Sequence, residues 1–226
     1  MSDAALGLLL AVIGGAAGWT GAKVADRVLS DRGEDDIVVQ PSWVAPVVAG
    51  FTAALFGLVP VFVEDGFLTV AYLWFVALTM TLFVTDVQAR LIPDRINYPG
   101  TGIAAGLLLV ASVAAGASSS LSRAAVGAGI YFVLTLGLFV VGGGRSFGGG
   151  DVKLSVVLGL YTAFLGWDAL AAAIVLGFLI GGVAGLVLLV SRMRGLRDHF
   201  AFGPPMILGA YIAIAAGEEL VRWYVG

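Results

Sequence analysis

The sequence predicts an all-α membrane protein, a polytopic bundle of about eight transmembrane helices. Apolar residues make up 60% of the chain and charged residues only 12%, roughly half the charged share of soluble domains. This number of charged residues is too small to cover a water-facing surface of ordinary polarity. Part of the surface must therefore face lipid. The second observation is a series of long apolar runs, and a transmembrane helix needs about 20 such residues.

Eight apolar segments are candidate spans. The connections between them alternate along the chain between brief ones and longer, more polar ones. The spans are 4–24, 44–63, 67–86, 98–116, 122–142, 152–166, 169–190 and 204–217. We expect the first to be a retained helix, because Met1-Ser2-Asp3 lacks the basic start of a cleaved signal. We expect these spans to form a single membrane domain over residues 1–226.

The distribution of Lys and Arg predicts the orientation. Ten of the 12 basic residues lie on or beside the connections 25–43, 87–97, 143–151 and 191–203, and only Arg123 and Arg222 lie on the other side. Basic residues collect on the cytoplasmic side of membrane proteins. These four connections are therefore expected in the cytoplasm, and both termini outside.

Small residues at helical spacing predict close helix packing. Gly177, Gly181 and Gly185 form two overlapping GxxxG steps, and Gly14 with Gly18 forms another. Such steps let helix backbones approach closely in lipid, although glycine is also simply abundant here, at 33 residues.

Several kinds of site are excluded or not indicated by composition. The chain has no cysteine, so disulfides, thiolate zinc sites and cysteine nucleophiles are excluded. The single histidine, His199, excludes multi-histidine metal sites. We expect no metal, no cofactor and no nucleic-acid partner.

Two aspartates at predicted helix ends, Asp86 and Asp151, are the candidate catalytic residues. Asp86 ends one apolar run and Asp151 begins another, and both are expected on the cytoplasmic side. Two neighbouring carboxylates do not both ionise readily, so one tends to keep its proton. A protonated acid beside an ionised one can polarise a carbonyl and activate a water. Each aspartate alone could instead be a helix cap or an interfacial charge.

Three glycines, Gly148, Gly149 and Gly150, come directly before Asp151. They remove every side chain that would crowd the carboxylate, and they permit backbone conformations closed to other residues. An extended peptide substrate could lie against this bare backbone.

These motifs resemble the type IV prepilin peptidases, which include the archaeal preflagellin peptidases. Gly148-Gly149-Gly150-Asp151 fits the GxGD motif, and Asp86 followed by Ile92-Pro93-Asp94 fits a second pattern of that family. Lys153-Leu154 extends the first match, and Phe202-Gly203-Pro204 matches a segment before the last helix. The resemblance runs from about residue 68 to 216, with the peptidase core over 68–185.

The resemblance implies a membrane aspartic endopeptidase in the cytoplasmic (inner) membrane, with Asp86 and Asp151 as the catalytic pair. It implies cleavage of basic leader peptides from type IV prepilins or pseudopilins at the cytoplasmic face. Bacterial members commonly carry a cysteine zinc motif after the first helix, and the short loop 25–43 has none. No residues of the family's N-methyltransferase activity map onto this chain, so that activity is left open.

Other interpretations of these residues stay open. Asp94 is either a third acid or an anchor at the start of the next helix, and Lys153 either orients substrate or is an ordinary interfacial lysine. Intramembrane aspartates also occur in ion- or proton-coupled transporters, which is the alternative function. A relative that cleaves other membrane segments is a third possibility. The sequence leaves the oligomeric state open.

Overall fold

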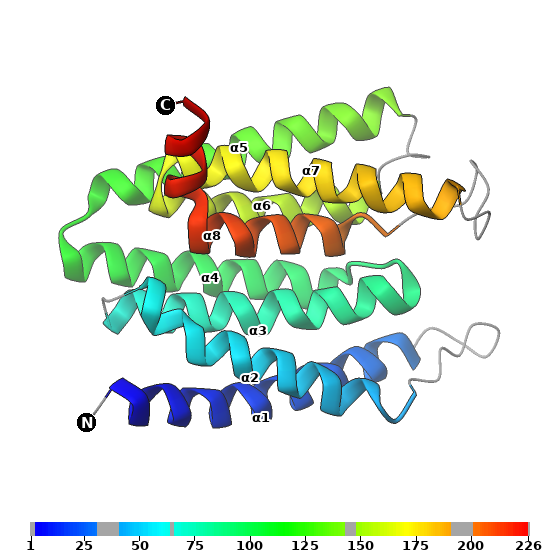
Figure 1. Ribbon diagram of the computed structural model, residues 1–226, viewed down its shortest axis with the longest axis horizontal. Coiled ribbons are helices and arrows are strands. Elements are labelled where there is room, and N and C mark those ends of the chain that lie inside the picture. Colours follow the sequence, from blue (N-terminus) through cyan, green and yellow to red (C-terminus); the bar gives the residue numbers. More distant parts are fainter. Residues whose placement is uncertain (1–2, 31–40, 64–65, 143–147, 191–200, 226) are drawn as a thin grey trace. The chain divides into compact units, whose positions relative to one another are not determined.

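A computed structural model describes residues 3–30, 41–63, 66–142, 148–190 and 201–225, and over these residues it is all-helical (Figure 1). This confirms the predicted fold class. The described residues form eight helices. They are α1 (Asp3–Ser30), α2 (Val44–Phe62), α3 (Gly66–Ala89), α4 (Asp94–Ala115), α5 (Ser118–Val141), α6 (Gly149–Leu165), α7 (Trp167–Val190) and α8 (Gly203–Val225).

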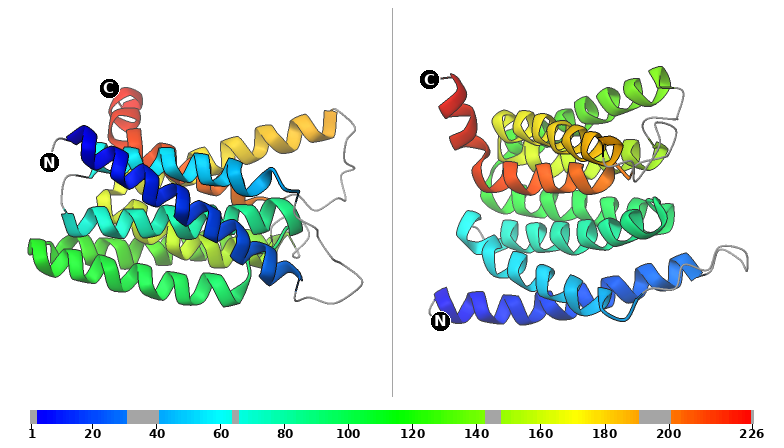
Figure 2. Two further views of the ribbon diagram at one scale, coloured as in Figure 1. Left: turned by 90° about the horizontal axis from the view of Figure 1, so that it is seen from below. Right: turned by 45° about the vertical axis from the view of Figure 1, so that its right-hand side comes forward.

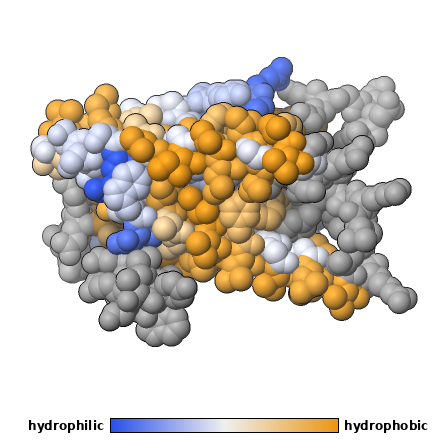
Figure 3. All heavy atoms as spheres, turned by 90° about the horizontal axis from the view of Figure 1, so that it is seen from above, coloured by the Kyte–Doolittle hydropathy of each residue, from blue (hydrophilic) through white to orange (hydrophobic). Residues whose placement is uncertain are grey.

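Most of these helices are long and apolar enough to span a bilayer. Within the described residues, six qualify by length and composition: α1, α2, α3, α4, α5 and α7. The helix α6 has 17 residues, and the apolar stretch found in α8 is Gly203–Ala216. Large apolar side chains are exposed on many helices, and Figure 3 shows a broad apolar band on one face. Such a surface suits contact with lipid.

Two predicted connections are shorter in the structure than the hydropathy pattern indicated. The first residues of the loop predicted over 25–43 belong to α1. This helix continues to Ser30, because Ala25 and Leu29 remain on its buried face. The loop predicted over 87–97 shrinks to the residues between Ala89 and Asp94. At the end of α1 and at the start of α4, the helix therefore includes charged residues that lie outside the apolar run.

The helices fall into two compact units, Met1–Ala115 with α1 to α4 and Gly116–Gly226 with α5 to α8. Within each unit successive helices run in alternating directions (Figures 1 and 2). The end of α3 and the start of α4 therefore lie at one end of the first unit. The end of α5 and the start of α6 likewise lie together in the second.

Glycine contacts hold the first unit together. A Cβ at Gly18 would lie 2.6 Å from the Thr52 hydroxyl of α2, and one at Gly14 would lie equally close to Phe56. Between α3 and α4, the Leu78 side chain fills the space beside Gly100. The Trp74 Nε1–H donates a hydrogen bond of 2.9 Å to the Gly100 carbonyl.

In the second unit, glycines likewise allow close contact at two helix pairs. A Cβ at Gly159 of α6 would lie 2.8 Å from the Ala128 Cα of α5, and one at Gly209 of α8 would lie 2.8 Å from the Gly177 Cα of α7. Gly181 also sits at a contact, whereas Gly185 has open space beside it. The predicted packing role is thus confirmed for the GxxxG glycines that contact a neighbouring helix or segment, and Gly185 is the exception.

Candidate active site

Asp86 lies in the last turns of α3 and is only 4% exposed. Three threonines of α3 use their hydroxyls within the helix. Thr79, Thr81 and Thr85 each donate to a backbone carbonyl one turn earlier in α3, the usual way to satisfy a hydroxyl inside an apolar helix.

The helix carrying Asp86 ends in an unusual turn. Arg90 has a φ of 53°, in the left-handed region, where non-glycine residues are uncommon. Its N–H donates a hydrogen bond of 2.8 Å to the Asp86 carbonyl, so the chain leaves α3 in the αL motif that normally has glycine at this place. The turn fixes where α3 stops relative to Asp86.

Asp151 lies in the first turn of α6 and is 5% exposed. Its Oδ2 accepts a hydrogen bond of 3.1 Å from the Gly148 N–H, and its own N–H donates to the Gly148 carbonyl, also at 3.1 Å. The carboxylate bond is one half of a capping box, in which the side chain of the third helical residue accepts from the N–H of the cap residue. The helix-cap interpretation of Asp151 is therefore correct, and capping accounts for its Oδ2.

The glycines before Asp151 form the entry to α6. Gly148 is extended (φ −80°, ψ 147°), while Gly149 and Gly150 already belong to the helix. A Cβ at Gly148 would lie 3.1 Å from the Asp151 Oδ2, and one at Gly149 would lie 3.8 Å from the ring of Phe139. The prediction that bare backbone keeps side chains off the carboxylate is consistent with the geometry at Gly148.

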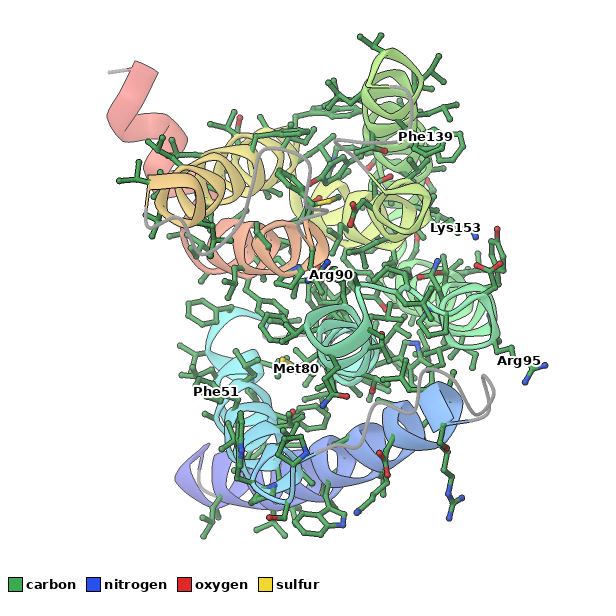
Figure 4. All side chains as sticks on the ribbon, turned by 90° about the vertical axis from the view of Figure 1, so that its right-hand side faces the viewer. Phe51, Met80, Arg90, Arg95, Phe139 and Lys153 are labelled. Carbon is green, nitrogen blue, oxygen red and sulfur yellow. The ribbon has the colours of Figure 1, made fainter. Side chains whose placement is uncertain are left out.

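The other predicted site residues lie near these two helix ends. Asp94 is the first residue of α4 and is exposed, which suits an acidic anchor at the amino end of a helix. The buried residues Ile92 and Pro93 precede it. Lys153 is half-buried, and Figure 4 shows its side chain extending from α6 away from α7 and α8.

Asp86 belongs to the first unit and Asp151 to the second. The pairing of the two carboxyl groups stays a prediction. His199 and part of the connection before Gly148 lie outside the described residues.

Sequence reasoning missed the polar contacts that fix α6 against α5. The Thr135 and Ser155 hydroxyls form a buried hydrogen bond of 2.9 Å, and Ser155 lies one turn after Asp151. At the other end, the Arg123 guanidinium donates to the carbonyls of Ala163 and Phe164 at 2.6 Å each and to that of Leu165 at 3.1 Å. These carbonyls have no partner within their own helix. The position of Ser155 one turn from Asp151 was readable from the sequence, but the partners on α5 were not.

The segment Phe202-Gly203-Pro204 also has a physical role. The Phe202 ring packs against Gly181 and lies 5.5 Å from the ring centre of Phe178, both on α7. This contact anchors the start of α8 on α7, at the end of the second unit where α6 begins.

Comparisons with known proteins agree with these motifs. The model of the type IV leader peptidase family matches residues 70–186, a segment that includes both aspartates. Among curated proteins, the prepilin leader peptidase/N-methyltransferase of Aeromonas hydrophila is 30% identical over 186 residues, 80% of this chain and 61% of that protein. The proteins of the same name from Neisseria gonorrhoeae and Bacillus subtilis are each 29% identical, over 80% and 67% of this chain and 61% and 57% of their own length.

This chain therefore spans about 60% of the length of the first of these relatives. Their names describe peptidases and not transporters. No solved structure matches the chain.

Proposed function

Because this chain belongs to the type IV leader peptidase family, we propose that it is a membrane aspartic endopeptidase that removes basic leader peptides from type IV prepilins or pseudopilins. The observation that supports this most directly is the pair of buried carboxyl groups, Asp86 and Asp151, inside the matched segment. A buried ionisable group in an apolar bundle is costly and points to a function.

The proposed chemistry needs one charged and one protonated carboxyl group. Asp151 suits the charged role, because a backbone N–H donates to its carboxylate and it lies at the amino end of α6, where negative charge is favoured. Asp86 then carries the proton and donates it in a hydrogen bond to the carbonyl oxygen of the scissile peptide. In this arrangement the charged and protonated groups act together on one peptide bond.

Hydrolysis then proceeds by general acid–base catalysis. Asp151 takes a proton from a water as the water oxygen bonds to the carbonyl carbon, and the carbonyl oxygen takes the proton of Asp86. When the C–N bond breaks, Asp151 gives its proton to the leaving amine, and the proton on the intermediate's hydroxyl returns to Asp86. The products are a carboxylic acid and an amine, and the pair returns to its starting state.

We further propose that the site faces the cytoplasm in the cytoplasmic membrane. The support is the asymmetry of Lys and Arg, of which Arg90, Arg95 and Lys153 lie at or near the helix ends that carry the two aspartates. Figure 4 looks onto these ends.

The test is incubation of the purified protein, in detergent or nanodiscs, with a prepilin-like peptide that carries a basic leader. Mass spectrometry should show a single cut between the leader and the apolar segment. Absence of that product from wild-type protein, under conditions in which a known family member cleaves the same peptide, would overturn the proposal. Transport driven by an ion gradient in liposomes, without any cleavage, would instead support the transporter hypothesis.

A further inference from the structure

Buried side-chain polar atoms without a hydrogen-bond partner occur, among the described residues, in Gln88, Asn97, Thr101 and Tyr131. Leaving such a group unsatisfied costs about 1–3 kcal/mol. A protein that keeps one therefore commonly uses it to hold an ordered water or for catalysis. Asn97 is only 1% exposed, and its Oδ1 is one of these atoms.

The packing of α4 on α3 places Asn97 opposite the last turns of α3. The two helices are joined by a short connection, so they run antiparallel, and Gly100 lies against Leu78 and accepts a hydrogen bond from Trp74. One turn from Gly100 toward the connection reaches Asn97. One turn from Leu78 in the same direction reaches Leu82, which lies level with Asn97, and Asp86 lies one turn beyond it toward the end of α3.

The direction of helical side chains brings Asn97 and Asp86 closer still. Side chains lean toward the amino end of their own helix. In this antiparallel pair Asn97 therefore leans toward the end of α3 that holds Asp86, and Asp86 leans back toward the level of Asn97. Both side chains are buried.

The other unpartnered side chains of this unit, Gln88 and Thr101, are less well placed to contact the Asp86 carboxyl. Gln88 follows Asp86 by two residues, which turns it about 160° away around the helix axis. Thr101 lies one turn farther along α4 from the connection than Asn97. Asn97 is thus the unsatisfied group of this unit that is best placed to act on Asp86.

We propose that Asn97 is a positioning residue for Asp86, and that its Oδ1 accepts a hydrogen bond from a buried water that also contacts the Asp86 carboxyl. The water satisfies the amide oxygen and fixes the orientation of the carboxyl group. This role rests on the proposed function, because it serves the carboxyl that acts as the acid. Misplacement of a reacting group by about 1 Å can cost roughly 100-fold in rate.

The decisive variant is Asn97→Leu, which keeps the size of the side chain and removes the unsatisfied oxygen. Its thermal unfolding is measured alongside, so that a loss of rate is separated from a loss of folded protein. Its kcat should fall at least about tenfold, with KM changed by less than about twofold, since substrate binding is not the target. Asn97→Ser should recover part of the rate, because a hydroxyl and the space beside it can again hold water.

The matched control is Thr101→Val, which removes another unpartnered oxygen from the same helix one turn farther away. It should leave kcat near the wild-type value. Equal kcat in Asn97→Leu and Thr101→Val would overturn the proposal. So would a loss of kcat in Asn97→Leu that is fully accounted for by a smaller folded fraction.

A second readout does not depend on peptidase activity. At a pH low enough to protonate it, the Asp86 carboxyl band in the infrared spectrum can be assigned by its loss in Asp86→Asn. Asn97→Leu should shift this band and Thr101→Val should not, and an unshifted band in Asn97→Leu would overturn the proposal. If wild-type protein fails to cleave prepilin peptides, the proposed function fails while this band still decides the role of Asn97.

Discussion

The two candidate catalytic aspartates lie at opposite kinds of helix end. Asp86 is near the carboxyl end of α3, a 24-residue apolar helix, whereas Asp151 is in the first turn of α6, which has 17 residues. The backbone at the start of α6 donates a hydrogen bond to the Asp151 carboxylate, but the carboxyl end of a helix offers only carbonyls. Similar side chains are therefore given different surroundings by the direction of the helix alone.

The helices that carry them are also held differently. The polar contacts of α6 with α5 include a hydroxyl pair and a guanidinium. The helix α3 is joined to α4 by the hydrogen bond from Trp74, well before Asp86, while Thr81 and Thr85, nearer to Asp86, bond to their own backbone. The position of Asp151 thus depends on specific polar contacts between helices. The position of Asp86 depends more on apolar packing and on the turn at Arg90.

The largest expected effect comes from removing either carboxyl group. Asp86→Asn and Asp151→Asn should each lower kcat by roughly 1,000-fold or more, because an amide can neither take nor give the proton. Peptide cleavage followed by mass spectrometry, at matched amounts of folded protein, measures the loss. Appreciable turnover by either variant would mean that the two aspartates do not share the chemistry.

The next effect concerns the stability of the α5–α6 hairpin. Arg123→Met should lower the free energy of unfolding by about 2–3 kcal/mol, because charged hydrogen bonds to the end of α6 are lost. The free energy of unfolding of Arg123→Lys should lie between those of the wild type and Arg123→Met, because lysine keeps the charge but lacks the planar set of guanidinium donors. Thermal unfolding in detergent gives the comparison.

The control for Arg123 is Arg95→Met on α4. Arg95 is exposed, and Figure 4 shows it pointing away from its helix, so its removal should change the unfolding temperature very little. Equal destabilisation by both variants would show that the contacts of Arg123 do not hold α6.

A smaller effect is expected from crowding the Asp151 carboxylate. Gly148→Ala puts a Cβ 3.1 Å from the Asp151 Oδ2, so the carboxylate must shift and kcat should fall by about fivefold. Gly129→Ala in α5 adds the same methyl group where no atom lies within 4 Å. That variant should keep full activity and gain about 0.5–1 kcal/mol of stability. If Gly148→Ala has the same kcat as Gly129→Ala, Gly148 does not influence the Asp151 carboxylate.

No effect is expected from metal removal. In the proposed chemistry both the base and the acid are carboxyl groups, so cleavage should be the same before and after EDTA treatment. A loss of activity that zinc or magnesium restores would show that a metal shares in the chemistry.

Much of the fold could be predicted because a transmembrane helix needs about 20 apolar residues whatever its neighbours are. The helix ends were harder to place. Arg27 and the acidic residue before it looked like a loop, yet α1 continues to Ser30. The apolar span predicted over 98–116 begins four residues after the start of α4 at Asp94, the residue that the sequence offered as an anchor for the start of this helix.

Only those parts of the site that are marked by residue type or motif could be predicted from the sequence. Asp86 and Asp151 are visible in the sequence because an ionisable residue is unusual in an apolar run, and the glycines because three of them stand together directly before Asp151. The positive φ of Arg90, the hydroxyl pair of Thr135 with Ser155 and the unsatisfied oxygen of Asn97 are not. They depend on helix register and on which faces meet, and a single sequence does not specify either.

The contacts of Arg123 have a consequence for how the chain enters the membrane. In the proposed orientation Arg123 lies, with Arg222, on the side that has few basic residues, and its guanidinium donates to carbonyls at the end of α6. A lone α5 would have to carry an uncompensated cation across the bilayer. We therefore expect α5 and α6 to be inserted together as a helical hairpin. A single cysteine placed beside Arg123, in a chain that otherwise has none, should become accessible from the outer side only after α6 has been synthesised.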